Sequence, residues 1–185
     1  MTNFKVLTAD TAPSQAKELL QNTEKNFGFL PNLIGVLANS PALTEAYLTV
    51  AGIFAKSGLN ATEQQIVLLT VSHYHECCYC MAAHTAIAGM QNVDNEIIQA
   101  IRDNQPLKDQ KLQVLRQLTH SLVDNRGWVS ETEVQAFLDA GYQQSHLLDI
   151  LVGVAQKTMS NFTNHIASTP LDDAFEEVAW KANII

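Results

Sequence analysis

Two cysteines and a histidine are spaced so that they could act together in a redox reaction. Cys77, Cys80 and His84 form the pattern Cys-x-x-Cys-x-x-x-His. If a helix begins at about Cys77 or Cys78, these side chains share one face of it. Two cysteines three residues apart across a helix start can close a small disulfide. Cys77 would lie near the positive end of the helix dipole and Cys80 one turn from His84, so each thiol has a reason to form the reactive thiolate.

Two other interpretations of these residues must be weighed. Two cysteines and a histidine could bind zinc, with Cys78 or another histidine as the fourth ligand. A second Cys/His pair at ligand spacing is missing elsewhere in the sequence, which disfavours zinc. The cysteines could instead be small buried apolar residues, but a histidine at the matching helical offset favours redox chemistry. Cys78 should point away from the pair, and we expect it to be a packing residue.

Length and composition describe the protein that carries this motif. The 185 residues suffice for one domain, 1–185, with its own core. The net charge of −8, with no basic patch, argues against a nucleic-acid partner. The start of the sequence lacks the features of a signal peptide, and no apolar run approaches the length of a membrane span, so we expect a cytoplasmic protein that does not enter a membrane. In a reducing compartment, three cysteines with this spacing indicate redox catalysis rather than a structural disulfide.

The segments around the motif have the spacing of helices. Apolar residues recur every three or four positions, glycines follow several of these segments, and the alternation typical of strands is absent. We therefore predict an all-α helical bundle with the cysteine helix near its centre. Expected capping pairs are Asn60 with Glu63 or Thr62 with Gln65 before 61–74, and Ser130 with Glu133 before 131–141. The other expected helices are 13–28, 41–58, 77–89, a short one through 97–101, 108–127 and 145–167, and residues 30–40 are expected to form a short helix or a turn.

Residues 59–88, LNATEQQIVLLTVSHYHECCYCMAAHTAIA, resemble the core of the alkyl hydroperoxidase D-like, or carboxymuconolactone decarboxylase, family. The core motif covers about 59–90, and a weaker similarity to peroxidase-related members extends over the second half. The resemblance implies an all-α, oligomeric peroxidase or disulfide reductase that forms trimers or hexamers. A thioredoxin-like interpretation of the cysteine pair fails, because no strand precedes it. The residues that match the family pattern are Glu63, Ile66, Val67, Leu69, Val71, Cys77, Tyr79, Cys80, Ala83 and His84.

The resemblance also implies a role for each residue of the motif. Cys80 attacks the peroxide and becomes a sulfenic acid, Cys77 resolves it to a disulfide, and His84 relays a proton. Physical reasoning alone leaves open which thiol leads, because the helix dipole favours Cys77 and the histidine favours Cys80. An external dithiol protein, lipoyl-bearing or thioredoxin-like, would reduce the disulfide, and no bound cofactor is required.

The family pattern is broken at one position. The family's proton-relay glutamate lies twelve residues before the first cysteine, where this sequence has Gln65. An amide can orient a thiol or a water molecule, but it cannot exchange a proton. Candidate substitutes are Glu63, which is also a natural helix cap, His73, which could be a core histidine, and Glu76, which could be solvated.

A second polar cluster lies near the end of the last long helix. Asn161, Asn164 and His165 share one helical face, and Ser160 precedes them. The favoured interpretation is a solvent-facing helix end. The alternative is that this face lines the cysteine pocket and binds substrate, which would make His165 a pocket residue.

Two functions follow from this reasoning. The favoured one is an antioxidant enzyme that reduces hydroperoxides through a dithiol formed by Cys77 and Cys80. The alternative is a non-enzymatic redox sensor or disulfide-exchange partner. Several strongly apolar helices also predict surplus apolar surface and therefore a homo-oligomer.

Overall fold

The expected all-α fold is confirmed by the computed structural model, which describes residues 4–182. Within that range the chain forms α-helices and one 3₁₀ helix and no strand. The helices are α1 (Ser14–Phe27), α2 (Asn32–Leu37), α3 (Pro41–Phe54), α4 (Ala61–Tyr74), α5 (Cys78–Met90), α6 (Asn95–Arg102), α7 (Gln110–Asp124), α8 (Glu131–Asp139), α9 (Gln144–Ala167) and the 3₁₀ helix η1 (Asp173–Val178).

Helix starts follow the capping residues in the sequence. At the start of α4, the backbone N–H of Glu63 donates to Asn60 Oδ1 at 3.0 Å, and the N–H of Asn60 donates to Glu63 Oε2 at 2.9 Å. This is the first of the two predicted capping boxes, and the second, Thr62 with Gln65, is not used because the Gln65 side chain bonds elsewhere. The predicted box at the start of α8 is also formed.

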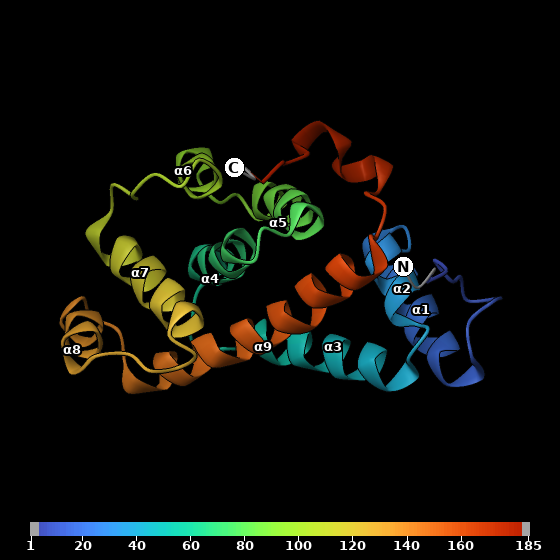
Figure 1. Ribbon diagram of the computed structural model, residues 1–185, viewed down its shortest axis with the longest axis horizontal. Helices are drawn as coiled ribbons and strands as arrows, with labels where there is room; N and C mark the ends of the chain where they lie inside the picture. Colours follow the sequence, from blue (N-terminus) through green and yellow to red (C-terminus); the bar gives the residue numbers. More distant parts are fainter. Residues whose placement is uncertain (1–3, 183–185) are drawn as a thin grey trace.

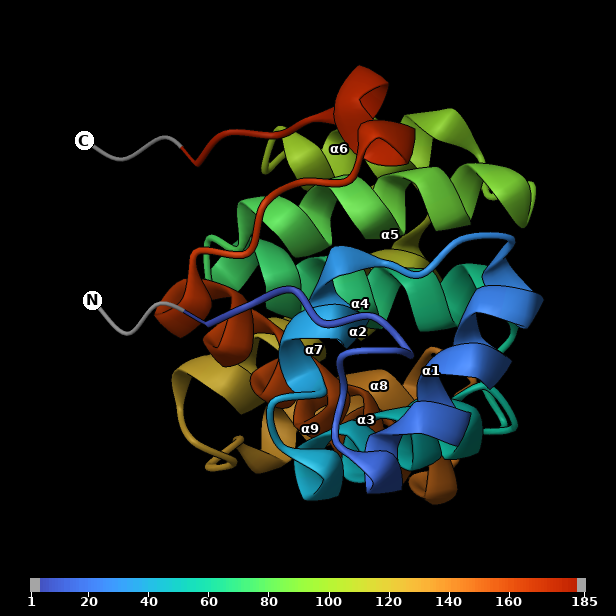
Figure 2. The same cartoon turned by 90° about the vertical axis from the view of Figure 1, so that its right-hand side faces the viewer.

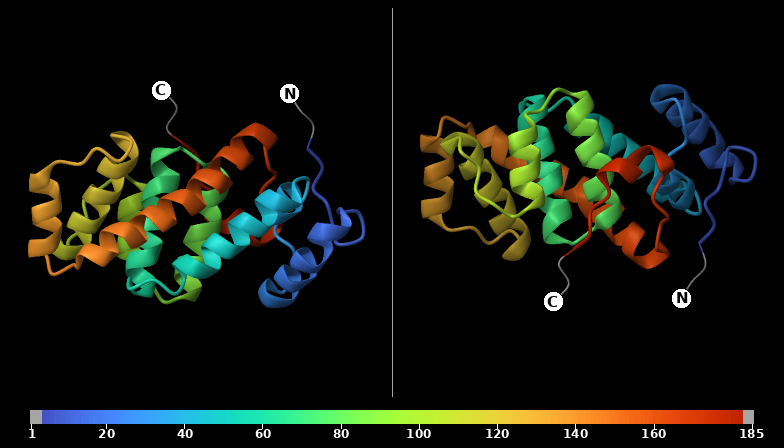
Figure 3. Two further views of the ribbon diagram at one scale, coloured as in Figure 1. Left: turned by 90° about the horizontal axis from the view of Figure 1, so that it is seen from below. Right: turned by 90° about the horizontal axis from the view of Figure 1, so that it is seen from above.

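The helices are arranged along an elongated molecule. Figure 1 shows α1 and α2 at one end and α7 and α8 at the other, with α4 and α5 between them. The long helix α9 runs beside α3 and reaches across most of this length, as the two views of Figure 3 also show. The last described segment, with η1, turns back over α5 (Figure 2). This return segment was not expected from the sequence.

The cysteines lie in one of the two main apolar clusters of the core. One cluster is built around α4 and α7, with contributions from α8 and α9. The other contains both motif cysteines and joins α1, α2, α3 and α5 to the return segment. Gly153 lets α9 pass close to both α3 and α4, because a Cβ atom there would lie 2.8 Å from Val67 Cγ1 and 2.9 Å from Phe54 Cζ. The close crossing brings the second half of α9 against α5.

Part of α9 remains uncovered. Four apolar side chains with spacings that place them on one side of the helix are exposed. We call this set the outer face of α9, and it consists of Leu148, Leu151, Phe162 and Ile166.

No helix between residues 4 and 182 is both long enough and apolar enough to cross a bilayer.

Candidate redox site

A tight connection between α4 and α5 positions the two motif cysteines. Glu76 has a φ of 54°, in the left-handed region, and so reverses the chain within three residues. The backbone N–H of Cys77 donates to the Ser72 carbonyl at 2.9 Å, and the Cys77 carbonyl accepts from the N–H of Met81 at 2.9 Å. Cys77 is therefore the N-cap of α5, as expected, and Cys80 lies one turn further along.

The two sulfur atoms share one hydrogen-bond donor. Asn164 Nδ2, on α9, lies 3.2 Å from Cys80 Sγ and 3.6 Å from Cys77 Sγ. The Ser160 hydroxyl, one turn earlier on α9, lies 3.7 Å from Cys80 Sγ. Both cysteines are reduced and about 1% exposed. Cys78 is exposed, so its expected packing role is wrong: its place on α5 faces away from the core.

The surroundings make the two thiols unequal. Burial opposes ionisation of Cys80, but the hydrogen bond from the Cys77 thiol and the positive charge of Lys157 outweigh it and hold the pKa of Cys80 well below the usual range. The same hydrogen bond to Cys80, together with burial, raises the pKa of Cys77. The helix dipole that favoured Cys77 is thus overridden, and Cys80 is the more acidic thiol of the pair.

Lys157 is the functional candidate that the sequence reasoning missed. Its side chain is fully buried, and its Nζ has no nitrogen or oxygen hydrogen-bond partner among residues 4–182. Burial lowers the pKa of Lys157, but the negative charge of Cys80 and contributions from Tyr47 raise it overall. The only signal in the sequence was that residues 150–171, which include most of α9, contain one lysine and no other Lys, Arg, Asp or Glu.

Gln65 contacts His84 rather than a sulfur atom. His84 Nδ1 lies 3.0 Å from Gln65 Oε1, and because an amide oxygen only accepts, the imidazole donates from Nδ1. Gln65 Nε2 in turn donates to Gln91 Oε1 at 3.0 Å. Burial, followed by the charge of Lys157, keeps the pKa of His84 well below its usual value. His84 is thus a neutral imidazole whose Nε2 is left as an acceptor.

A cavity of about 150 Å³ opens onto Cys80. Most of its wall is apolar and comes from α1, α2, α3 and α5. Its polar groups belong to Cys80, His84, Tyr47, Tyr79, Gln156, Lys157 and Thr23. A small, largely apolar molecule with one reactive polar end would fit these walls.

The return segment completes one side of the cavity. The hydroxyl of Tyr79 donates to the buried Asp172 carboxylate, whose other oxygen accepts from the backbone N–H of Asn32 at 2.9 Å. Three residues later, Phe175 lines the cavity and packs edge-on against Tyr79 and Phe29. Arg102 holds the far end of the segment by donating to the Val178 and Ala179 carbonyls, each at 3.0 Å.

The other predicted site residues lie outside this cavity. Glu63 caps α4 and approaches Lys111 Nζ at 3.6 Å. The His73 ring packs on Trp180, with ring centroids 5.3 Å apart. His165 is exposed. None of these three side chains lines the cavity at Cys80.

The second polar cluster faces the cysteines in part. Ser160, Asn161 and Asn164 are buried, so the favoured solvent-facing interpretation is wrong for these three residues. Asn161 Oδ1 lies 3.0 Å from His75 Nδ1 and supports the turn that precedes the cysteines. The error arose because α9 was expected to end in solvent, whereas α5 covers this face of it.

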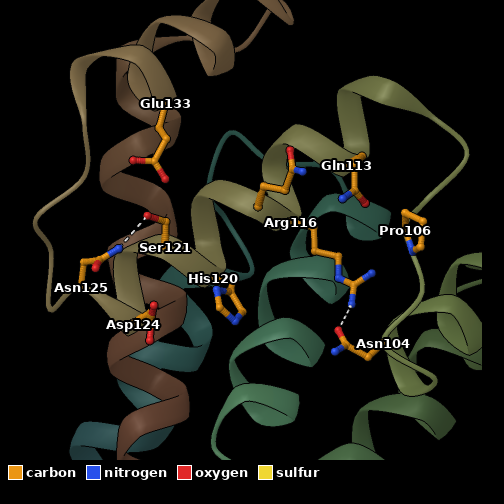
Figure 4. Close-up of a pocket in the computed structure, with 10 residues that line it drawn as sticks. Asn104, Pro106, Gln113, Arg116, His120, Ser121, Asp124, Asn125 and Glu133 are labelled. Carbon is orange, nitrogen blue, oxygen red and sulfur yellow. Dashed lines mark hydrogen bonds between the residues drawn. The ribbon is translucent and has the colours of Figure 1, made fainter.

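A larger hollow elsewhere lacks the groups for thiol chemistry. It measures about 680 Å³ and is lined mainly by α7 and the loops that flank it (Figure 4). Its polar side chains are largely paired with neighbours: Arg116 donates to Asn104 Oδ1 at 2.9 Å and to the Gln105 carbonyl, and Asn125 donates to Ser121 Oγ at 3.1 Å. Across residues 4–182, no three His, Cys, Asp or Glu side chains are grouped to hold a metal ion.

Comparison with known proteins places the segment that carries this site in a family. Residues 41–107, which include α4 and α5, match the sequence profile of the carboxymuconolactone decarboxylase family. This segment belongs to that family. The assignment agrees with the resemblance noted between residues 59 and 88. No curated protein matches the chain significantly.

Several solved structures share the fold of nearly the whole chain. An uncharacterized peroxidase-related protein from Ralstonia eutropha, described as an alkylhydroperoxidase AhpD core, is 18% identical, with a TM-score of 0.83 over 94% of this chain and 93% of its own. A peroxidase-related protein from Silicibacter is 18% identical, with a TM-score of 0.78 over 95% and 97%. The debrominase Bmp8, in complex with 2,3,4-tribromopyrrole, is 17% identical, with a TM-score of 0.79 over 96% and 95%. At these identities the comparison shows a shared fold.

Proposed function

We propose that the protein is a thiol-dependent peroxidase that reduces small hydroperoxides through the Cys77 and Cys80 pair. The observation that carries this proposal is the position of Cys80: its sulfur lies at a small apolar cavity, receives a hydrogen bond from Asn164 at 3.2 Å and has the Cys77 thiol beside it. A thiolate in such a place is a nucleophile, and a second thiol within reach protects it from further oxidation.

The proposed cycle has three steps. The Cys80 thiolate attacks the outer oxygen of the hydroperoxide, the O–O bond breaks, and Cys80 becomes a sulfenic acid, while the leaving alkoxide takes up one proton and departs as an alcohol. The Cys77 thiol then attacks the Cys80 sulfur, forming the disulfide and releasing water. An external dithiol reduces the disulfide and is itself oxidised to a disulfide.

The reductant is proposed to be a slender dithiol. Both cysteine residues are about 1% exposed, so a broad protein surface cannot reach their sulfur atoms without opening the site. A dithiol on a flexible arm, as in a lipoyl-bearing protein, suits this access better than the rigid cysteine pair of a thioredoxin-like protein.

A steady-state assay tests the proposal. The purified protein should consume tert-butyl hydroperoxide continuously with dihydrolipoamide as reductant. Cys80→Ser should abolish consumption, whereas Cys77→Ser should permit a single oxidation of Cys80. Cys78→Ser, at the exposed cysteine between them, should behave as the unaltered protein. A single stoichiometric oxidation of the unaltered protein would instead support the alternative function of a redox sensor.

The shared fold with a debrominase favours a second candidate reaction. The cavity of about 150 Å³ and its apolar walls suit a small ring. In that reaction a carbon–bromine bond would be replaced by a carbon–hydrogen bond, bromide would leave, and the two thiols would become the disulfide. Bromide release from 2,3,4-tribromopyrrole, absent in Cys80→Ser, would assign this reaction.

A further inference from the structure

The cavity at Cys80 contains a buried positive charge with no carboxylate to balance it. Lys157 is fully buried, its Nζ has no nitrogen or oxygen hydrogen-bond partner within the described chain, and Cys80 is the neighbour that most raises its pKa. No Asp or Glu is present among the described residues that line the cavity. An isolated ammonium out of water is strongly unfavourable, so it requires a nearby anion. The thiolate of Cys80 is the group in this cavity that supplies one.

The other polar groups near Cys80 are poorly placed to release a proton. His84 is neutral, and its one N–H, on Nδ1, is donated to Gln65. The Tyr79 hydroxyl is donated to Asp172. The Tyr47 hydroxyl is buried, and burial raises its pKa, because a phenolate would be left without water. The Cys77 thiol retains its proton, because its hydrogen bond to Cys80 and burial raise its pKa. Among the titratable groups around Cys80, the lysine is therefore the best placed to protonate an alkoxide formed in the cavity.

We propose that Lys157 is the proton donor of this site: its ammonium pairs with the Cys80 thiolate in the reduced protein and protonates the oxygen that leaves when a hydroperoxide is cleaved. This inference rests on the proposed peroxidase function. The S–O bond forms as the O–O bond breaks, the leaving alkoxide takes one proton from Lys157, and the lysine becomes a neutral amine. When the external dithiol later regenerates the Cys80 thiol, that thiol returns its proton to Lys157.

The charge pair explains why Lys157 releases its proton only when Cys80 is oxidised. While Cys80 is a thiolate, its charge holds the proton on Lys157 against the effect of burial. Oxidation to the sulfenic acid removes that charge, and burial then favours the neutral amine. The titratable groups that act on or are affected by the lysine are Cys77, Cys80 and His84 at α5, His75 in the turn before it, and Tyr47 on α3.

Reagents with different leaving groups separate proton donation from a simple charge effect. Single-turnover reaction of Cys80 is followed by mass spectrometry with iodoacetamide, peroxyacetic acid and tert-butyl hydroperoxide. Iodide and acetate leave without a proton, whereas tert-butoxide needs one. In Lys157→Met we expect all three rates to fall with the thiolate fraction. After correction for the iodoacetamide rate, only the tert-butyl hydroperoxide rate should fall further, by about 10² to 10⁴-fold, the contribution of a positioned acid. Lys108→Met, at an exposed lysine, is the control.

A second variant keeps the test decisive if Lys157→Met does not fold. Lys157→Arg keeps the positive charge, but a guanidinium does not release a proton in proteins. It should retain the iodoacetamide and peroxyacetic acid rates and lose the tert-butyl hydroperoxide rate. An equal loss with all three reagents, or no loss with the hydroperoxide, would overturn the proton-donor role and leave the peroxidase proposal intact. Failure of the unaltered protein to oxidise Cys80 faster than the exposed Cys78 would instead refute the peroxidase function itself.

Discussion

Replacing Asn164 should change the acidity of Cys80 by an amount that follows from its hydrogen bonds. Its Nδ2 donates to Cys80 Sγ at 3.2 Å, while its Oδ1 is buried with no hydrogen-bond partner in the described structure. Asn164→Leu keeps the approximate volume and removes the donor. A hydrogen bond to a charged group contributes about 1.5–3 kcal/mol. At about 1.36 kcal/mol per unit, its loss should raise the pKa of Cys80 by about 1–2 units.

The direction of this effect can be measured without any peroxide. The pKa is read from the pH dependence of Cys80 alkylation by iodoacetamide, in a Cys78→Ser background that removes the exposed thiol. Since thiolate is the reacting form, the curve should move to higher pH in Asn164→Leu. The stability of the fold should change little, because the substitution also removes an unpaired buried oxygen.

Asn161→Leu is the matched control for this experiment. It removes a neighbouring buried amide of the same helix, whose oxygen faces His75 rather than a sulfur atom. We expect a much smaller shift of the Cys80 pKa in this variant. Equal shifts in the two variants would refute the assignment of Asn164 as the donor that stabilises the thiolate.

Three further outcomes are expected. Mild oxidation should join Cys77 to Cys80 and leave Cys78 free, because only the first two share a buried donor; peptide mapping that found Cys78 in the disulfide would contradict this. Gln65→Glu should raise the pKa of His84 by about one unit, because a charge-assisted hydrogen bond replaces a neutral one; an unchanged NMR titration of the ring would contradict this. Light scattering at micromolar concentration should give a multiple of 20.4 kDa, because the apolar outer face of α9 is uncovered; a monomer mass would contradict the proposed homo-oligomer.

The helices could be predicted because their signals are local. The capping box of Asn60 and Glu63 fixes the start of α4, and Gly28, with a φ of 81°, ends α1 as expected. The face shared by Cys77 and Cys80 also follows from helical spacing alone. Some helix ends were missed, such as the end of α3 at Phe54. The chain turns there without a glycine, so no residue in the sequence marks the end of the helix.

The charge and donors of the site could not be predicted, because they come from contacts distant in sequence. Lys157 and Asn164 lie 77 and 84 residues beyond Cys80. Their spacing on α9 is compatible with a solvent-facing helix end as well as with a buried one, and only the packing of α9 on α5 distinguishes the two. The role of Asp172 in fixing Tyr79 was equally hidden, since it requires the chain to turn back after α9.

The inequality of the two thiols is therefore a property of the helix pair and not of the cysteine motif. The position of Cys77 at the start of α5 would favour its own ionisation. That preference is reversed by α9, which brings the ammonium of Lys157 to the same cavity as Cys80 and turns the amide of Asn164 toward its sulfur. The close approach of α9 at Gly153 makes this possible, because a side chain there would collide with Val67. The sequence of α5 thus places two thiols side by side, and the sequence of α9 makes Cys80 the more acidic of the two.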